Sequence, residues 1–244
     1  MQLQGHVALV TGGAKRVGRA IALALAERGA HVAISYRTSA AAARTTVRDA
    51  ENCGVRAVAI RADVARAADV KRLVAHTIKR LGGLHVLVNN AAVFFKTPWA
   101  RVSERDWDRT MDTNLKGPFL CSLEAGRWMQ RHGGGKIINI ADWAGLRPYS
   151  EYLPYCVPKA GVIALTQTLA KALAPTVQVV AIGPGPVAMP EDFSAAERAR
   201  IIQRVPLQRL GSPADIAATV RFLVEGTDFM TGSMVLVDGG QLIA

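Results

Sequence analysis

Short apolar runs alternate with stretches of helical periodicity along the whole chain. Runs rich in β-branched residues predict strands at 6–10, 31–35, 55–60, 86–88, 137–140, 177–182 and 234–237. Helix formers and apolar residues at helical spacing predict helices at 18–28, 39–54, 70–81, 104–131, 152–173 and 213–224. Gly29 and Gly82 directly follow two of these helices, as expected where a helix ends. The pattern is therefore strand, helix, strand throughout.

This alternation favours one fold class. Strands joined by helices form right-handed βαβ units, which build a parallel sheet covered by helices on both faces. No linker, low-complexity tract or short-period repeat interrupts the chain, so residues 1–244 are expected to form a single domain. We expect an α/β, doubly wound (Rossmann) sheet of about seven strands. Ligands of such sheets bind where the strands end, so the residues that follow the strands carry the functional information.

Composition narrows the class of protein. Of the 244 residues, 50% are hydrophobic and 20% are charged, which is enough for a sizeable core. Cys53, Cys121 and Cys156 form neither a disulfide framework nor a metal-ligand pattern. The first residues lack the pattern of a signal peptide, and no later run is long enough for a membrane span. We expect a cytoplasmic protein without a metal or a membrane partner.

The net charge of +11 is compatible with nucleic acid, an anionic cofactor or simply a basic surface. The arginines are spread along the chain, and no helix-turn-helix, zinc or RNA-binding signature accompanies them. We therefore expect a small-molecule substrate and no nucleic-acid partner.

The turn after the first strand is a candidate phosphate site. Residues 11–18 read Thr-Gly-Gly-Ala-Lys-Arg-Val-Gly and lead into a helix, whose first N–H groups and dipole can bind a phosphate. Tight turns also need glycine for backbone reasons, so the turn alone fits binding and structure equally well.

The end of the second strand bears on the choice of cofactor. Residues 35–39 read Ser-Tyr-Arg-Thr-Ser, without the carboxylate that usually bonds the ribose hydroxyls of NAD. An added 2′-phosphate requires a cation instead. Arg16 and Arg37 therefore favour NADPH, the other interpretation being two solvated arginines.

Tyr155 and Lys159 are candidates for proton transfer. Their spacing of four places both side chains on one face of a helix. The ammonium is expected to lower the pKa of the phenol from about 10. Tyr149 and Tyr152 have no lysine at that spacing, so Tyr155 is the tyrosine expected to act.

These features together resemble the short-chain dehydrogenase/reductase family over residues 5–240. The turn is similar to its TGxxxGxG segment, with Arg16 at the middle glycine, while 89–92 resembles NNAG and 237–240 its VDGG ending. The resemblance implies that Tyr155 is the acid, that Lys159 also binds the nicotinamide ribose, and that Asn114 is a structural and proton-relay residue. It also implies a homotetramer packed through the helices around 106–131 and 152–173.

The same resemblance implies a set of residues that bind NADP. Asp63 follows the third strand where the family contacts adenine, although it could equally cap a helix. Met189 stands where the family often has a nicotinamide-binding threonine, in a loop of 189–205 expected to form a lid without a readable motif. The expected cofactor-binding residues are Gly12, Lys15, Arg16, Val17, Gly18, Tyr36, Arg37, Asp63, Val64, Asn90, Ala91, Tyr155, Lys159, Pro184, Gly185 and Val187.

One departure from the family points to the substrate. The family's catalytic serine precedes its tyrosine by 13 positions, and that position is Asp142 here. An ionised carboxylate only accepts hydrogen bonds, which suits a substrate with N–H groups. Among relatives, pteridine reductases carry Asp at this place and a similar arginine in the turn. Phe94 matches the phenylalanine on which they stack the pterin.

Three hypotheses follow. The first is an NADPH-dependent reductase of a pteridine-like C=N heterocycle, with Phe94, Asp142 and Tyr155 contacting the substrate. The second is an NADPH-dependent carbonyl reductase that tolerates Asp142, with 3-oxoacyl-carrier-protein reductases as the nearest class. The third is a catalytically silent NADPH-binding protein, against which the retained Tyr155, Lys159 and Asn114 argue.

Overall fold

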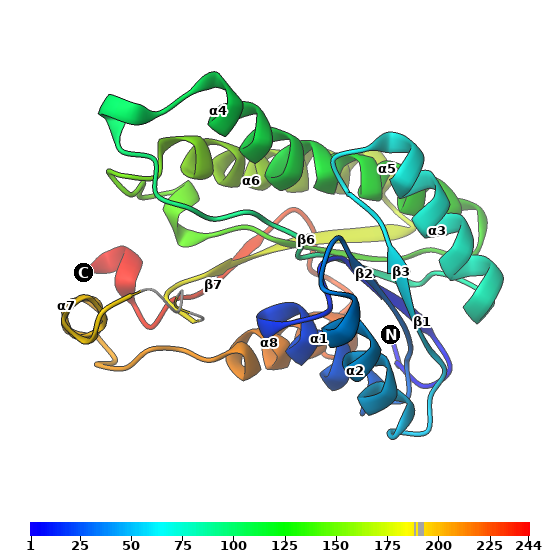
Figure 1. Cartoon of the computed structure of the whole chain (residues 1–244). Coiled ribbons are helices and arrows are strands. Elements are labelled where there is room, and N and C mark those ends of the chain that lie inside the picture. The colour runs from blue at the N-terminus through cyan, green and yellow to red at the C-terminus, as the bar shows by residue number, and fades with distance from the viewer. Residues whose placement is uncertain (188, 190–192) are drawn as a thin grey trace.

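Seven parallel strands form one sheet in the computed structural model, which describes residues 1–187, 189 and 193–244 (Figure 1). Their order across the sheet is β3-β2-β1-β4-β5-β6-β7, so the direction of winding reverses between β1 and β4. The strands are β1 (Val7–Val10), β2 (His31–Tyr36), β3 (Ala57–Arg61), β4 (Val86–Asn89), β5 (Gly135–Ile140), β6 (Val177–Pro184) and β7 (Met234–Val237). The doubly wound fold class expected from the sequence is confirmed.

Helices cover both faces of the sheet (Figure 1). One layer consists of α1 (Arg16–Ala26), α2 (Ala40–Glu51) and α8 (Pro213–Glu225). The other consists of α3 (Ala67–Leu81), α5 (Gly117–Arg131) and α6 (Leu153–Leu173), with α4 (Glu104–Met111) packed beside α6. Ala8 and Val10 belong to the first core, whereas Val7 and Leu9 belong to the second. The strands are therefore apolar at consecutive positions because both faces are buried.

The expected helix at 104–131 is interrupted. α4 ends at Met111, a π-helical segment follows at Asp112–Lys116, and α5 begins at Gly117. The segment includes Asn114, whose amide hydrogen-bonds the backbone of Val93 in the loop after β4. A π-helical turn holds one more residue than an α-helical turn, and a continuous helical pattern over 104–131 does not distinguish the two.

The expected lid loop contains a helix, α7 (Ala195–Gln203). Ser194 and Glu197 form a capping box at its start, since each side chain accepts a hydrogen bond from the other's backbone N–H. The Ser-x-x-Glu spacing at 194–197 is the sequence signal for this helix start. Of the expected lid, 190–192 lie outside the described residues.

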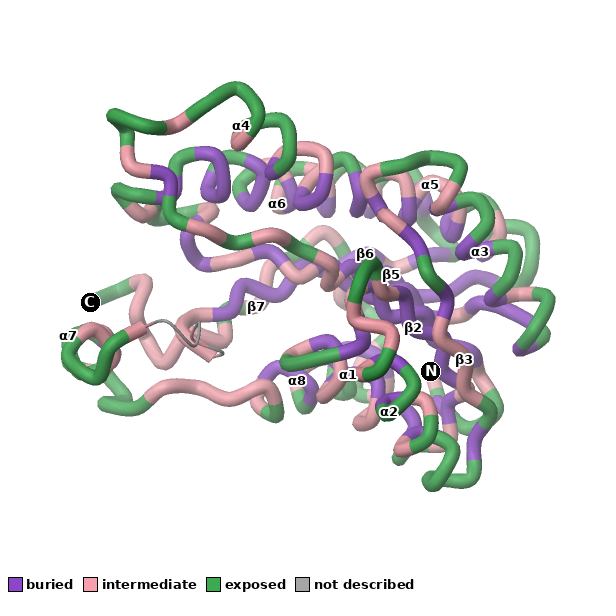
Figure 2. Tube along the Cα trace, viewed as in Figure 1, coloured by how far each residue is buried: buried purple, intermediate pink, exposed green. Residues whose placement is uncertain are grey.

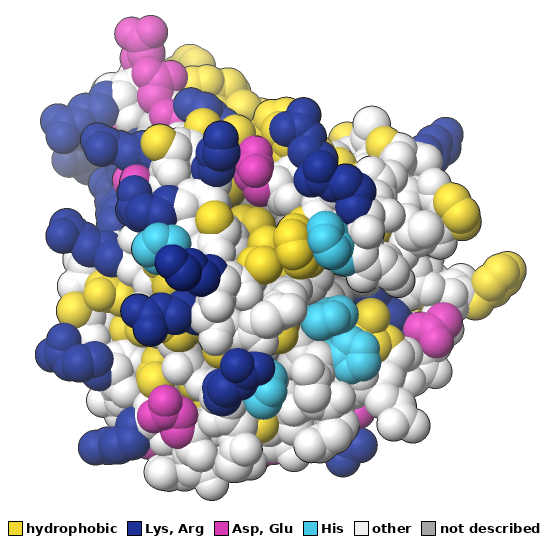
Figure 3. Space-filling model, turned by 90° about the vertical axis from the view of Figure 1, so that its right-hand side faces the viewer, with side chains coloured by type: hydrophobic (Ala, Val, Ile, Leu, Met, Phe, Trp, Pro, Cys, Tyr) yellow, Lys and Arg dark blue, Asp and Glu magenta, His cyan; other side chains and the backbone are white. Residues whose placement is uncertain are grey.

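Burial follows the layers. Figure 2 shows the central strands and the inward sides of the helices buried, whereas α7 is intermediate or exposed. On the face seen in Figure 3, Lys and Arg are scattered among hydrophobic and other atoms. Within the described residues, no helix is long and apolar enough to cross a membrane, and no His, Cys, Asp and Glu group could hold a metal ion.

Candidate active site

A cavity of about 1250 Å³ lies along the ends of the strands. Its wall is built by the turn after β1, by the segments that follow β2 to β6, and by the first turns of α6. Every residue expected to bind the cofactor lines this cavity, and so do Phe94 and Asp142. Asn114 is the exception among the expected site residues, because it is not part of the wall.

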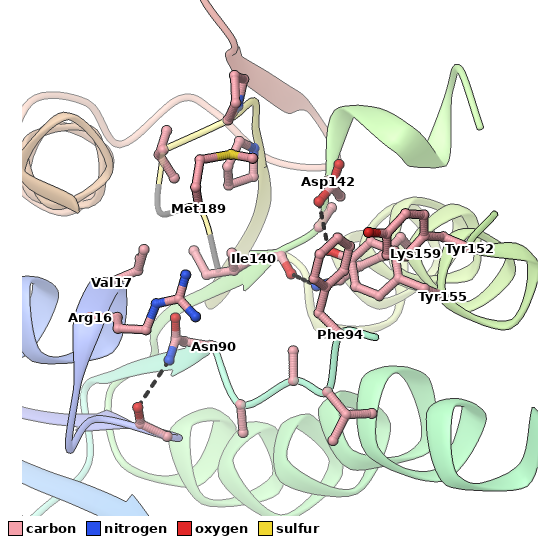
Figure 4. A pocket seen from close by; sticks show the side chains of 18 of the residues that line it. Arg16, Val17, Asn90, Phe94, Ile140, Asp142, Tyr152, Tyr155, Lys159 and Met189 are labelled. Carbon is pink, nitrogen blue, oxygen red and sulfur yellow. Dashed lines mark hydrogen bonds between the residues drawn. The ribbon is translucent and has the colours of Figure 1, made fainter. Parts of the chain in front are cut away.

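The turn after β1 requires glycine where the chain approaches itself. Gly12 has a φ of +64°, and a Cβ there would lie 3.0 Å from the Cα of Ala91. A Cβ on Gly18 would collide with the carbonyl oxygen of Gly12. The Asn90 side-chain amide donates to the carbonyl oxygens of Thr11 at 2.9 Å and Gly12 at 3.3 Å, which fixes this turn against the end of β4 (Figure 4).

The start of α1 opens into this turn without its own cap. Lys15 stands at the N-cap, no described side chain caps the helix, and its first turn contains no acidic residue. Arg16 takes a left-handed φ of +52°, which is uncommon for a residue with a Cβ. The first N–H groups and the positive end of the helix dipole therefore face the cavity, and they fit the phosphates of a dinucleotide.

A second cavity of about 370 Å³ adjoins the first at Arg37. It is lined by Arg37, Arg61, Ala62, Asp63, Arg66, Asp69 and Arg72. Both of its carboxylates are engaged: Asp63 accepts from Ala65 N at 3.1 Å, and Asp69 pairs with Arg72 at 3.0 Å. The environment beyond β2 is therefore cationic, as a 2′-phosphate requires. Asp63 bonds its own loop and does not cap α3, whose N-cap is Arg66 without a side-chain cap, so the capping alternative is wrong. Adenine contact by Asp63 stays a prediction.

Tyr155, Asp142 and Lys159 meet at the beginning of α6 (Figure 4). The Tyr155 hydroxyl donates to Asp142 Oδ2 at 2.6 Å. Asp142 Oδ1 accepts from Ala144 N at 2.8 Å, which fixes the carboxylate at the end of β5. The ammonium of Lys159 donates to the carbonyl oxygen of Ile140 at 2.7 Å and lies 5.7 Å from the centre of the Tyr155 ring. The candidate acid is thus bonded to the carboxylate and not to the lysine.

The pKa values follow from burial and from this pairing. Burial and the Asp142 charge raise the pKa of Tyr155 well above its usual value near 10. The net pKa of the phenol is therefore raised, not lowered as expected from Lys159, because burial and Asp142 decide its direction in the chain by itself. Burial also lowers the pKa of Lys159 to about 8, although the Asp142 charge opposes this shift. The pKa of the Asp142 carboxyl is raised by burial, which the hydrogen bond from Tyr155 partly offsets.

Phe94 covers Tyr155 at the cavity wall. Its ring stacks on Tyr152, with centres 4.6 Å apart and planes 10° apart, and meets Tyr155 edge to face at 4.7 Å. Phe94 remains 40% exposed, so part of the ring is open to a ligand. Tyr152 is a wall residue that the Tyr–Lys spacing does not point to, whereas the repeat of Tyr149, Tyr152 and Tyr155 at intervals of three is the sequence signal for an aromatic wall.

Asn114 holds the loop that carries Phe94. Its Oδ1 accepts from Val93 N at 2.8 Å and its Nδ2 donates to Val93 O at 2.9 Å. The residue is only 1% exposed, so its side chain is committed to the backbone next to Phe94. These two hydrogen bonds account for the structural role expected of Asn114, while its proton-relay role stays a prediction.

Comparisons with known proteins agree with this arrangement. Residues 12–241 match the family described as enoyl-(acyl carrier protein) reductase. A 3-oxoacyl-[acyl-carrier-protein] reductase of Synechocystis is 39% identical over 246 residues, covering 99% of this chain and 98% of the relative.

Two solved structures are also similar. A dehydrogenase/reductase from Sinorhizobium meliloti superposes with a TM-score of 0.92 at 35% identity, covering 98% of this chain and 97% of that one. A blue fluorescent protein from a metagenomic library, solved in complex with NADPH, has a TM-score of 0.92 at 34% identity and covers 99% of each chain. The chain is therefore an oxidoreductase of the short-chain dehydrogenase/reductase family.

Proposed function

We propose that this enzyme reduces a flat, amino-substituted C=N heterocycle of the dihydropteridine type, with NADPH as the reductant. The observation that carries the proposal is the 2.6 Å hydrogen bond between Asp142 and Tyr155. A carboxylate bonded directly to the acid accepts N–H groups, whereas a ketone oxygen calls for donors. The exposed part of Phe94 supplies an apolar surface for a flat ring beside this pair.

Tyr155, Asp142 and Lys159 have different roles in the proposed reaction. A bound nicotinamide supplies the hydride. Tyr155 donates its proton to the ring nitrogen next to the carbon that is reduced. The Asp142 carboxylate accepts from the Tyr155 hydroxyl at 2.6 Å and positions it, and solvent returns the proton that Tyr155 gives up. Lys159, held by Ile140 O, places a positive charge beside the phenol and stabilises the charge that develops as the proton leaves.

The preference for NADPH rests on the cations beyond β2. Arg16 and Arg37 line the large cavity, and Arg37 also lines the smaller one together with Arg61 and Arg66. A phosphate monoester placed there gains charge-assisted hydrogen bonds from guanidinium groups. A free ribose hydroxyl gains much less, so NADH is the weaker cofactor.

The second candidate function is reduction of a ketone, such as a 3-oxoacyl thioester. The similarity to a protein named 3-oxoacyl-[acyl-carrier-protein] reductase favours it. In that case Tyr155 protonates the substrate oxygen, and Asp142 orients a water or a polar substituent. The developing oxyanion would lie close to a carboxylate, and this is why we rank it second.

A substrate panel separates these functions. Loss of NADPH absorbance is followed with 7,8-dihydrobiopterin, a quinone and acetoacetyl thioesters. We expect kcat/KM for the dihydropterin to exceed that for the ketones by about tenfold or more. Efficient ketone reduction without pterin turnover would replace the first function by the second. Tight NADPH binding without any turnover would indicate a silent binding protein.

We also propose that the chain forms a homotetramer through α5 and α6. Phe119 on α5 is 43% exposed, and Leu153 and Val157, one turn apart on α6, are 39% and 41% exposed. Apolar side chains at neighbouring helical positions suit a twofold helix-to-helix contact. Light scattering at micromolar concentration tests this, and a monomeric mass would contradict it.

A further inference from the structure

Four cationic side chains line the part of the cavity that lies away from the cofactor residues. Lys96 comes from the loop after β4, Arg147 follows β5, Arg200 lies in α7, and Arg204 is the C-cap of α7. None of these segments is the turn after β1 or the end of β2, where the cofactor phosphates are expected. In Figure 1, α7 lies at the left edge of the molecule, apart from α1 and α2. The cations therefore belong to the substrate end of the cavity.

α7 turns one face toward this space. Glu197, Arg200, Ile201 and Arg204 all line the cavity, and their spacing of three, one and three residues places them on a single helical face. Two guanidinium groups one turn apart on this face can bind the same anion. Arg147 faces the same space and donates to the carbonyl oxygen of Ala244.

The acidic residue on this face is already engaged. Glu197 Oε2 accepts from the backbone N–H and hydroxyl of Ser194, both at 2.9 Å. Its Oε1 lies 3.3 Å from the ammonium of Lys96. Arg200 and Arg204 form no ion pair with any described residue. The carboxylate thus neutralises Lys96 and anchors α7 to the loop of Phe94, while both arginines remain directed at the cavity.

We propose that the substrate carries an anionic extension, a carboxylate or a phosphate, that Arg200 and Arg204 bind while the reacting ring lies against Phe94. This inference names the substrate class of the site and rests on the proposed function for the identity of the ring. Guanidinium groups match both anions through paired N–H donors. A cationic wall in a concave site also raises the local concentration of an anionic substrate, and salt weakens that effect.

The test compares substrates that share a ring and differ in the tail. The probes are 7,8-dihydrofolate with carboxylates, 7,8-dihydroneopterin triphosphate with phosphates, and 7,8-dihydrobiopterin with an uncharged side chain. Each is assayed with the native enzyme, with Arg200→Gln/Arg204→Gln, and with Lys171→Gln/Arg221→Gln. The last variant changes the net charge equally at exposed positions outside the cavity wall.

We expect the α7 variant to lose about tenfold or more in kcat/KM for the anionic probes, largely through KM, and to keep dihydrobiopterin turnover within about twofold. The control variant keeps all three activities. The anionic probe whose kcat/KM falls in the α7 variant identifies carboxylate or phosphate as the natural anion. Equal loss on all probes, or no loss, would overturn the inference.

A second pair of substrates tests the anionic extension if the proposed function is wrong. Should the native enzyme reduce no pterin, the same variants are compared on acetoacetyl-CoA, which carries phosphates, and on the uncharged acetoacetyl-N-acetylcysteamine. Selective loss on the CoA thioester would uphold the anionic tail with a different reacting group. If the α7 variant loses no more activity on acetoacetyl-CoA than on the uncharged thioester, the anionic extension is overturned as well.

Discussion

Asp142 Oδ2 lies 2.6 Å from the Tyr155 hydroxyl, although a serine is expected in this family at Asp142. The two groups share one hydrogen bond in a buried site, so their protonation states are linked and the pair titrates as a unit. A serine would leave the phenol without a charged neighbour on that side. The substitution therefore changes both what the site accepts from a substrate and how it holds its own proton.

Removing the phenol oxygen should stop the chemistry. In Tyr155→Phe we expect kcat to fall at least about 10²-fold, because proton donation is lost. NADPH affinity should stay nearly constant, since Lys159 keeps its bond to Ile140 O. Steady-state kinetics and fluorescence titration with NADPH measure the two effects. Full activity in this variant would remove Tyr155 from the mechanism.

Cofactor choice should depend on Arg37. The native enzyme is expected to prefer NADPH over NADH by about tenfold or more, which corresponds to about 1.4 kcal/mol from one good charge-assisted contact. Arg37→Asp should lose this preference, and Arg221→Asp, an equal charge change on α8, should keep it. Equal kcat/KM values for the two cofactors in the native enzyme would contradict the assignment.

Asn114 should matter for stability. Asn114→Ala leaves the N–H and C=O of Val93 without their partners in a partly buried place, so we expect a loss of about 1–3 kcal/mol in the free energy of unfolding. Urea denaturation measures it. A variant with unchanged stability and lost activity would instead point to the proton-relay role alone.

Two histidines should make the fold sensitive to mild acid. His85 Nδ1 accepts from Val7 N at 3.0 Å, and His31 Nδ1 accepts from Arg56 N at 3.1 Å. Burial lowers both pKa values, with help from neighbouring His6 and Arg56 respectively. A base with a lowered folded-state pKa contributes stability above its unfolded pKa near 6.5 and loses it as the pH falls below that value.

Urea denaturation at pH 7.5 and pH 5.5 checks this. The native chain should lose stability between the two conditions, and His31→Asn/His85→Asn should lose less, because an amide oxygen accepts the same bonds without titrating. Asp69, Asp215 and Asp228 have lowered pKa values and act at lower pH. An identical loss in both proteins would refute the role of the histidines.

The parts of this molecule that repeat along the chain could be predicted from its sequence. β1 is recognisable because Val7 to Val10 are all apolar, and the glycines of the following turn stand where the backbone crowds Ala91. Features set by packing between distant segments could not be predicted. Nothing near Tyr155 in sequence shows that burial and Asp142 raise its pKa, nor that Asn114 bonds Val93.

The most direct test of the central claim is Asp142→Ser, with the ratio of kcat/KM for 7,8-dihydrobiopterin to that for ethyl acetoacetate as the measurement. Serine removes the carboxylate bonded to Tyr155 and restores a hydroxyl donor that suits a developing oxyanion. We predict that the ratio falls by about 10²-fold or more, with NADPH affinity unchanged. A ratio that stays the same, or native enzyme that reduces the ketone and ignores the pterin, would contradict the account.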